Sequence, residues 1–222
     1  MQIEHSNSNR RQFIKKTALT ATGISGMTIL PAFAFSREFA DEGIHIIGPK
    51  EGYSPQIGTL VSMMTWMRAT VLRSVQKLTQ QDLDVLFDTN SNTIGALLMH
   101  LAATESFYQV NTFQGLAGPQ MPAEFYKKWG AASNLGPAAR DKIKGNDLKY
   151  YVDMMTEVRE ATLAEFRKRD DAWLMQIDPK FFDGQPTNNY CKWFHVCEHE
   201  SNHNGQIKWY VKRLPGAKGG GD

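Results

Sequence analysis

The sequence predicts an all-α protein: a four-helix bundle with a long crossover connection between the second and third helices. Four long segments place apolar residues at steps of three and four, the spacing that buries one side of an α-helix. A stretch rich in glycine and proline, residues 115–145, separates the second segment from the third. No run alternates polar and apolar residues beside Gly/Asn turns, so we expect no sheet of consequence. Two helices, a long connection and two more helices are typical of such a bundle.

The first helix is expected over residues 54–78. Ser54-Pro55 is a favourable start, because a serine can cap free backbone N–H groups and proline already has the backbone angle of the first helical position. The apolar stripe that follows comprises Ile57, Leu60, Val61, Met64, Val71, Val75 and Leu78. Thr79-Gln80-Gln81-Asp82 then predicts the cap of a short helical turn.

The other three helices are predicted from similar signals. The second begins near Asn90-Ser91-Asn92 and ends near Gly115. The irregular connection 115–145 follows, with one short helix near residues 123–129. Asn146 is the expected cap of a third helix over residues 147–169. The fourth helix is expected over residues 188–213, where Leu214-Pro215-Gly216 ends it and leaves a flexible tail, residues 216–222.

The first 34 residues are expected to direct export. Asn9-Arg10-Arg11-Gln12-Phe13-Ile14-Lys15-Lys16 resembles a twin-arginine signal, and a weakly apolar run and the cleavage pattern Ala32-Phe33-Ala34 follow it. The run is too short and too polar to remain as a stable membrane anchor. We therefore expect the twin-arginine export machinery to carry the folded protein to the periplasm or outside the cell. Residues 35–53 then form a lead-in strap before the bundle, which spans residues 54–215.

Composition narrows the function further. Of the 222 residues, 41% are hydrophobic and 22% are charged, as is usual for a globular protein. The net charge of +2 arises in residues 1–34, where basic residues exceed acidic ones, so the remainder is near neutral and no nucleic-acid partner is expected. Cys191 and Cys197 stand six apart in one predicted helix and cannot bridge each other there. Their roles are left open.

The histidines carry the predicted chemistry. His195, His199 and His203 are spaced by four, so that neighbouring imidazoles lie one helical turn apart and a pair of them can bind one metal ion. The outer two are about 12 Å apart along the helix axis, so one of the three is expected beside the ion rather than bound to it. A third ligand would come from a facing helix. His100, in an otherwise apolar stretch of the second helix, is the candidate.

Two segments resemble the DinB/YfiT-like superfamily of metal-binding four-helix bundles. One is Asn92-Thr93-Ile94-Gly95-Ala96-Leu97-Leu98-Met99-His100-Leu101-Ala102-Ala103-Thr104-Glu105, and the other is His195-Val196-Cys197-Glu198-His199-Glu200-Ser201-Asn202-His203-Asn204-Gly205-Gln206-Ile207. The resemblance implies that His100, His199 and His203 hold one divalent ion, zinc or nickel, and that His195 lies beside it. It also implies a metal-dependent hydrolase or thiol-S-transferase acting on a small molecule, and often a homodimer.

Two alternatives remain from the sequence. His199-Glu200-Ser201-Asn202-His203 has the H-E-x-x-H pattern of zinc peptidases, in which the glutamate acts as a base. No His or Glu follows His203 as a further ligand, so the peptidase is disfavoured. Glu200 is left either as a base that faces the ion or as a solvated carboxylate. The second alternative is a non-catalytic, stress-associated bundle in which the ion only braces two helices.

Overall fold

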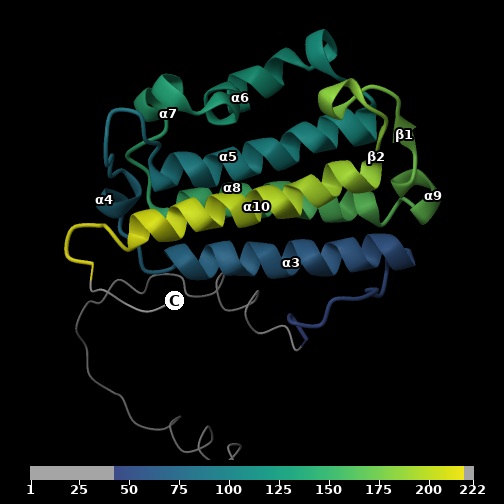
Figure 1. Cartoon of the computed structure of the whole chain (residues 1–222), viewed down its shortest axis with the longest axis horizontal. Helices are drawn as coiled ribbons and strands as arrows, with labels where there is room; N and C mark the ends of the chain where they lie inside the picture. Colours follow the sequence, from purple (N-terminus) through teal and green to yellow (C-terminus); the bar gives the residue numbers. More distant parts are fainter. Residues whose placement is uncertain (1–42, 218–222) are drawn as a thin grey trace, which may run out of the picture. The chain divides into compact units, whose positions relative to one another are not determined.

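The computed structural model describes residues 43–217, and the all-α prediction is confirmed for this part of the chain. Its longest helices are α3 (Pro55–Val75), α5 (Ile94–Tyr108), α8 (Leu148–Phe166) and α10 (Asn189–Val211). They run side by side, with α10 between α3 and α5 in the view of Figure 1. Helix α10 packs on α3 and α5, and α8 packs on the same two helices. The predicted signal (residues 1–34) and part of the strap lie outside the described residues.

The helix starts show which side chains act as caps. At α3, Ser54 makes no cap hydrogen bond, so the predicted role was wrong. Asp171 caps α3 instead: it accepts hydrogen bonds from the backbone N–H groups of Gln56 (3.1 Å) and Ile57 (3.3 Å). A carboxylate at a helix N-terminus also stabilises the helix dipole. At α8 the cap is Asp147 rather than Asn146, through a bond of 2.9 Å from the N–H of Tyr150.

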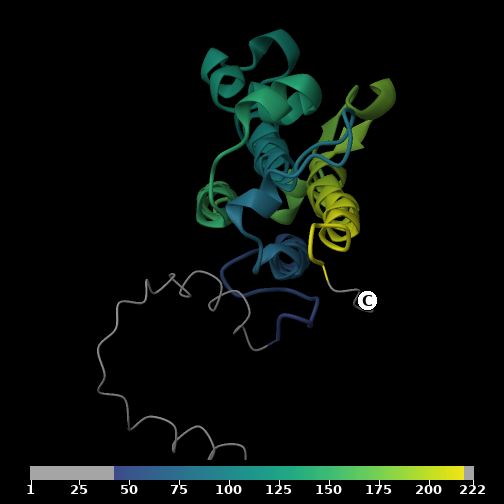
Figure 2. The same ribbon diagram turned by 90° about the vertical axis from the view of Figure 1, so that its left-hand side faces the viewer.

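The connection between α5 and α8 is more helical than expected. It holds the π-helix η1 (Gln109–Phe113), the 3-10 helix η2 (Gly118–Gln120), α6 (Ala123–Asn134) and α7 (Gly136–Lys142). The prediction of one short helix over 123–129 was too small, because Phe125, Trp129 and Ala132 continue one buried stripe across Gly130. Helix α6 packs on α5 and lies on the side of α5 away from α3, as Figure 2 shows with the long helices nearly end-on.

Short elements join the long helices elsewhere. Thr79 and Asp82 form a reciprocal cap on α4 (Gln80–Leu83), as their sequence predicts. Helix α9 (Asp171–Leu174) precedes the antiparallel pair β1 (Ile177–Asp178) and β2 (Thr187–Asn188), which enclose the 3-10 helix η3 (Phe182–Gly184). Two strands of two residues each agree with the expectation of no substantial sheet.

Close contacts explain two of the glycines inside the helices, Gly58 and Gly95. A side chain at Gly95 would place its Cβ 2.6 Å from the Tyr151 hydroxyl, so α5 and α8 touch there. A Cβ at Gly58 would lie 2.4 Å from the backbone nitrogen of Lys50, because the strap crosses α3 at this point. Within residues 43–217, none of the helices combines the length and apolar character needed to cross a membrane.

Candidate metal centre

Three histidines from two helices meet between α5 and α10. One ring nitrogen from each of His100, His199 and His203 lies within 4.8 Å of the others. The ring centroids are 4.8 Å apart for His100 and His199, 4.9 Å for His100 and His203, and 4.5 Å for His199 and His203. We call these three side chains the three-histidine cluster. The structure thus brings together the three residues that the sequence singled out as ligands.

Hydrogen bonds fix the orientation of two of these rings. The Nδ1 atom of His100 lies 2.8 Å from the backbone oxygen of Ala132, and because a carbonyl can only accept, Nδ1 carries the proton. His203 Nδ1 donates in the same way to Gln206 Oε1 at 3.1 Å. In a neutral imidazole the other nitrogen then has a free lone pair. Both Nε2 atoms are therefore prepared to bind a cation, with the supporting hydrogen bond that metal-bound histidines usually have.

The three imidazoles are held neutral. Burial lowers the pKa of His100, the hydrogen bond to Ala132 raises it and the nearby His203 lowers it, so that the pKa is about 4. Burial and the other histidines lower the pKa of His199 to about 3. Burial also lowers the pKa of His203. Neutral imidazole is the form that binds metal, so these shifts favour a cation over protons.

The contact between His199 and His100 shows what a cation would replace. Their Nε2 atoms lie 2.8 Å apart. Since His100 Nε2 has the lone pair, His199 Nε2 donates the proton in this contact. Two imidazole nitrogens bound to one tetrahedral zinc at about 2.0–2.1 Å need a separation of roughly 3.3 Å. A small opening of the two rings and movement of one proton within His199 would therefore make room for the ion.

Residues 59–210 match the sequence model of a family described as Mycothiol-S-transferase. The chain belongs to this family. The family is DinB/YfiT-like, so the superfamily resemblance of the two histidine segments is confirmed at this level. A comparison with curated proteins gives no match.

In this member of the mycothiol-S-transferase family, the three imidazole nitrogens of the cluster are a suitable set of ligands for a catalytic metal ion. Imidazole is a common ligand of zinc and of nickel, and three protein ligands leave positions for water or substrate. The chemistry of the family suggests a metal-dependent, thiol-S-transferase-like function. The residues present therefore fit the ion that the family implies.

His195 lies at the edge of the cluster, on the predicted row of α10. Its ring centroid is 5.1 Å from that of His199, and its Nδ1 atom is 2.8 Å from the hydroxyl oxygen of Tyr108. Burial lowers the pKa of His195 and raises that of Tyr108. Phe182, on the turn between β1 and β2, packs against His195 with ring centroids 5.4 Å apart. His195 thus neighbours His199, and its position beside a bound ion stays a prediction.

Glu200 neither faces the three-histidine cluster nor lies at the surface, as the two predictions for it required. Its Oε1 atom accepts hydrogen bonds from Arg68 Nε (2.9 Å), Arg68 Nη2 (2.7 Å) and Arg159 Nη2 (2.9 Å). The side chain is 2% exposed, so it is not a solvated carboxylate. Successive helical residues are turned by about 100°, which places Glu200 on a different side of α10 from His199. Both predictions for Glu200 were wrong because two guanidinium groups hold its carboxylate in the core, where it makes no hydrogen bond to the three-histidine cluster.

Glu105 completes a buried ion network that the sequence analysis did not identify. It accepts hydrogen bonds from Arg159 Nε at 2.8 Å and from Arg68 Nη2 at 2.9 Å. Burial raises its pKa, but the two arginines lower it more, so that the pKa of Glu105 lies below its usual value. We call Arg68, Glu105, Arg159 and Glu200 the ion-pair network. Four charged residues spaced far apart in the chain offered no local pattern by which to find it.

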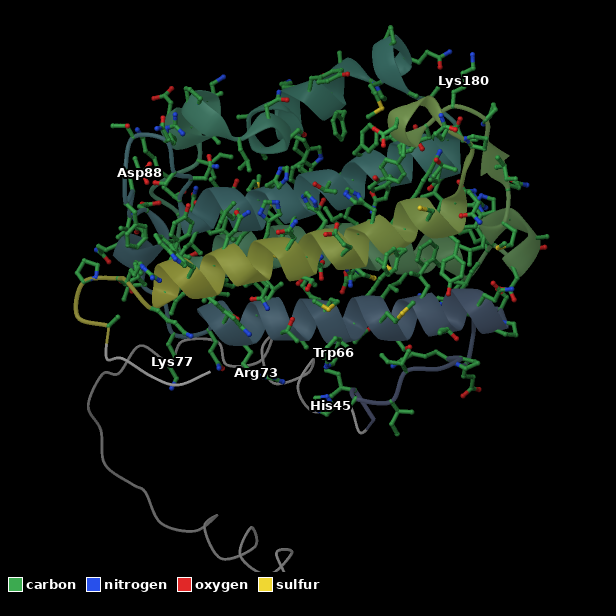
Figure 3. All side chains as sticks on the ribbon, in the orientation of Figure 1. His45, Trp66, Arg73, Lys77, Asp88 and Lys180 are labelled. Carbon is green, nitrogen blue, oxygen red and sulfur yellow. The ribbon has the colours of Figure 1, made fainter. Side chains whose placement is uncertain are left out.

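The remaining features lie apart from the cluster. His45 belongs to the strap and lies beside α3, on the side away from α5 (Figure 3). A cavity of about 300 Å³ between α5, α6 and α8 is lined by residues such as Gln109 and Trp129, and by none of the histidines. Cys191 and Cys197 are free, as their spacing predicted, and burial raises the pKa of Cys197 to about 12. A thiol with such a pKa is not a nucleophile at neutral pH.

Proposed function

We propose that the protein is an exported, metal-dependent thiol-S-transferase whose divalent ion is held by His100, His199 and His203. The observation that carries the proposal is the convergence of three neutral imidazoles from α5 and α10, two of them with Nδ1 hydrogen bonded and Nε2 unprotonated. The family match supports a thiol as one reactant. The mutual packing of α3, α5, α8 and α10 supports a four-helix bundle as the frame of the site.

Each residue has a defined part in this proposal. When bound, zinc or nickel would lower the pKa of a thiol and polarise the electrophile that receives it. The carbonyl of Ala132 and the amide of Gln206 keep His100 and His203 in the metal-binding tautomer. Tyr108 and His195 border the cluster and offer polar contacts to a substrate there. The name of the family makes mycothiol the first thiol to test.

The peptidase alternative loses support from the position of Glu200. A peptidase of the H-E-x-x-H type needs this carboxylate next to the metal-bound water. Here Glu200 is ion paired with Arg68 and Arg159 in the core. We therefore exclude Glu200 from the proposed reaction and assign it to the stability of the fold.

The direct test is thiol transfer by the full chain loaded with Zn²⁺ or Ni²⁺. Mycothiol and other small thiols would be offered with a panel of electrophiles, and thiol consumption and product would be followed with and without chelator. We expect metal-dependent transfer that His199→Ala abolishes and that the exposed substitution Ser201→Ala leaves unchanged. Hydrolysis of esters or amides without thiol transfer would favour the hydrolase instead. Tight metal binding with no turnover would favour the non-catalytic bundle.

The export part of the proposal has its own test. The arginine pair of a twin-arginine signal is recognised by a receptor, so charge alone does not suffice. Replacing Arg10 and Arg11 by lysine should leave uncleaved precursor in the cytoplasm, as detected by cell fractionation. Unchanged amounts of processed periplasmic protein would contradict the twin-arginine assignment.

A further inference from the structure

A second group of donor atoms adjoins the three-histidine cluster on α10. His195, Glu198 and His199 each place one ligand atom within 4.8 Å of the others. They stand at positions i, i+3 and i+4 of one helix, so their side chains project from the same side of α10. Two imidazoles and one carboxylate are among the donor sets by which proteins bind zinc.

The structure orients this second group and leaves it accessible. In the tautomer that presents Nε2, the Nδ1–H group of His195 donates to the hydroxyl oxygen of Tyr108, 2.8 Å away. The Nε2 atom then lies 3.9 Å from Glu198 Oε2. The side chains of His195 and Glu198 are 34% and 48% exposed, so a cation reaches them directly from solvent. Such a fixed ring beside an exposed carboxylate can close on an ion with little movement.

We propose that His195, Glu198 and His199 form a second divalent-cation position that shares His199 with the three-histidine cluster. Glu198 brings a negative charge that the cluster itself does not have. Greater exposure, however, leaves the carboxylate hydrated and makes this position the weaker of the two. Because one imidazole serves both groups, a cation in the second position withdraws a ligand from the first. The inference goes beyond the proposed function, since it holds whether or not the chain transfers a thiol.

The test removes the first position and asks what binding remains. His100→Asn keeps an N–H donor for the carbonyl of Ala132 but removes the Nε2 ligand. Zn²⁺ would be titrated into the full chain by calorimetry, and Co²⁺ by visible absorption, in this background. Glu198→Gln and His203→Ala would then be added separately, with circular dichroism as the check of folding. Glu198→Gln is an exposed, shape-conserving change, so it is not expected to unfold the protein.

The two added substitutions have opposite expected outcomes. If the second position exists, Glu198→Gln lowers the residual affinity roughly tenfold or more, and His203→Ala changes it less than about twofold. If the residual binding comes from the His199 and His203 pair, His203→Ala abolishes it and Glu198→Gln has no effect, which overturns the proposal. Loss of affinity in both variants would indicate one extended site and also overturns it. So does the absence of measurable cation binding in folded His100→Asn.

Discussion

Two neighbouring residues of α10, His199 and Glu200, belong to two regions that differ in charge: one consists of neutral imidazoles and the other of buried ion pairs. His199 faces His100 and His203, where three neutral nitrogens meet with no opposite charge among them. Glu200 lies in the ion-pair network, where two carboxylates match two guanidinium groups and Glu200 Oε2 is the one carboxylate oxygen without a hydrogen-bond partner. A buried ion network loses stability when one partner is removed, because a buried charge is then left uncompensated, whereas neutral imidazoles carry no charge that another residue must balance. The difference indicates that the cluster is kept for binding and the network for the fold.

The largest effect is expected from breaking the network. Glu200→Gln retains an oxygen that can accept from Arg68 and Arg159, but it removes the charge that balances them. An uncompensated buried charge costs about 3–5 kcal/mol, and the free energy of unfolding should fall by that amount in urea denaturation. Glu160→Gln, an exposed change on α8, is the control and should alter it by less than about 0.5 kcal/mol. Equal effects of the two substitutions would show that the network does not stabilise the fold.

A metal ion should stabilise the folded chain by binding to the three-histidine cluster, and not through the ion-pair network. An ion that binds the folded chain at one hundred times its dissociation constant stabilises it by about 2.7 kcal/mol. We expect Zn²⁺ to raise the melting temperature of the wild-type chain in a concentration-dependent way. His199→Ala should abolish this shift while the metal-free protein still unfolds cooperatively. A zinc-dependent shift of undiminished size in His199→Ala would place the ion elsewhere.

The pH dependence should separate the two regions. The pKa of His100 is about 4 and that of His199 about 3 in the folded chain, below the usual value of about 6.5 in the unfolded chain. The unfolded state therefore takes up protons first, and stability is full above about pH 6.5 and falls as the pH decreases toward these values. For the metal-free protein we expect each of these two histidines to contribute a loss on the order of 2 kcal/mol between pH 7 and pH 5.

The network should respond at lower pH. The pKa of Glu105 is below its usual value, so its contribution is present above about pH 4.5 and is lost only below it. A variant with His100, His199 and His203 all replaced by glutamine should therefore lose much less stability between pH 7 and pH 5, and the remaining loss comes from His195, whose pKa burial also lowers. An unaltered loss in that variant, measured by urea denaturation at each pH, would contradict the role given to the histidines.

The smallest effect is expected from an ion pair at the surface. Lys149 and Asp153 are paired one helical turn apart on α8, and both are about half exposed. Exposed pairs contribute roughly 0.2–0.5 kcal/mol, so Asp153→Asn should change the free energy of unfolding by no more than that. Added salt should remove even this difference, whereas it should leave the effect of Glu200→Gln nearly unchanged. A large effect of Asp153→Asn would remove the contrast between buried and exposed pairs.

Much of the helical frame could be predicted because its signals are local. The stripe beginning at Ile57 and the row His195, His199 and His203 follow from the period of the helix alone. The helix caps were less accurate, since Asp171 reaches α3 from more than a hundred residues away and displaces Ser54 from the predicted role. The extent of α6 was underestimated, because a glycine inside a helix looks like an interruption when its packing on α5 is unknown.

In the candidate site, too, features that follow from local sequence could be predicted, and features that depend on packing could not. His100 could be identified because a histidine is unusual in an apolar helix and a matching pair stood on another one. The position of Glu200 could not, since the H-E-x-x-H pattern states only spacing and not which side of α10 faces Arg68 and Arg159. The ion pairs of this network depend on the packing of four helices, α3, α5, α8 and α10, which no local sequence pattern contains.

The metal content of the purified chain tests the central claim most directly. Wild type, His199→Ala and Glu200→Gln would be loaded with Zn²⁺, freed of excess metal and measured by mass spectrometry, with folding checked by near-ultraviolet circular dichroism. Because His199 and Glu200 are adjacent but lie on different sides of α10, we predict about one tightly held ion in wild type and in the folded fraction of Glu200→Gln. We predict none in His199→Ala. A folded His199→Ala protein that retains its zinc would contradict the account.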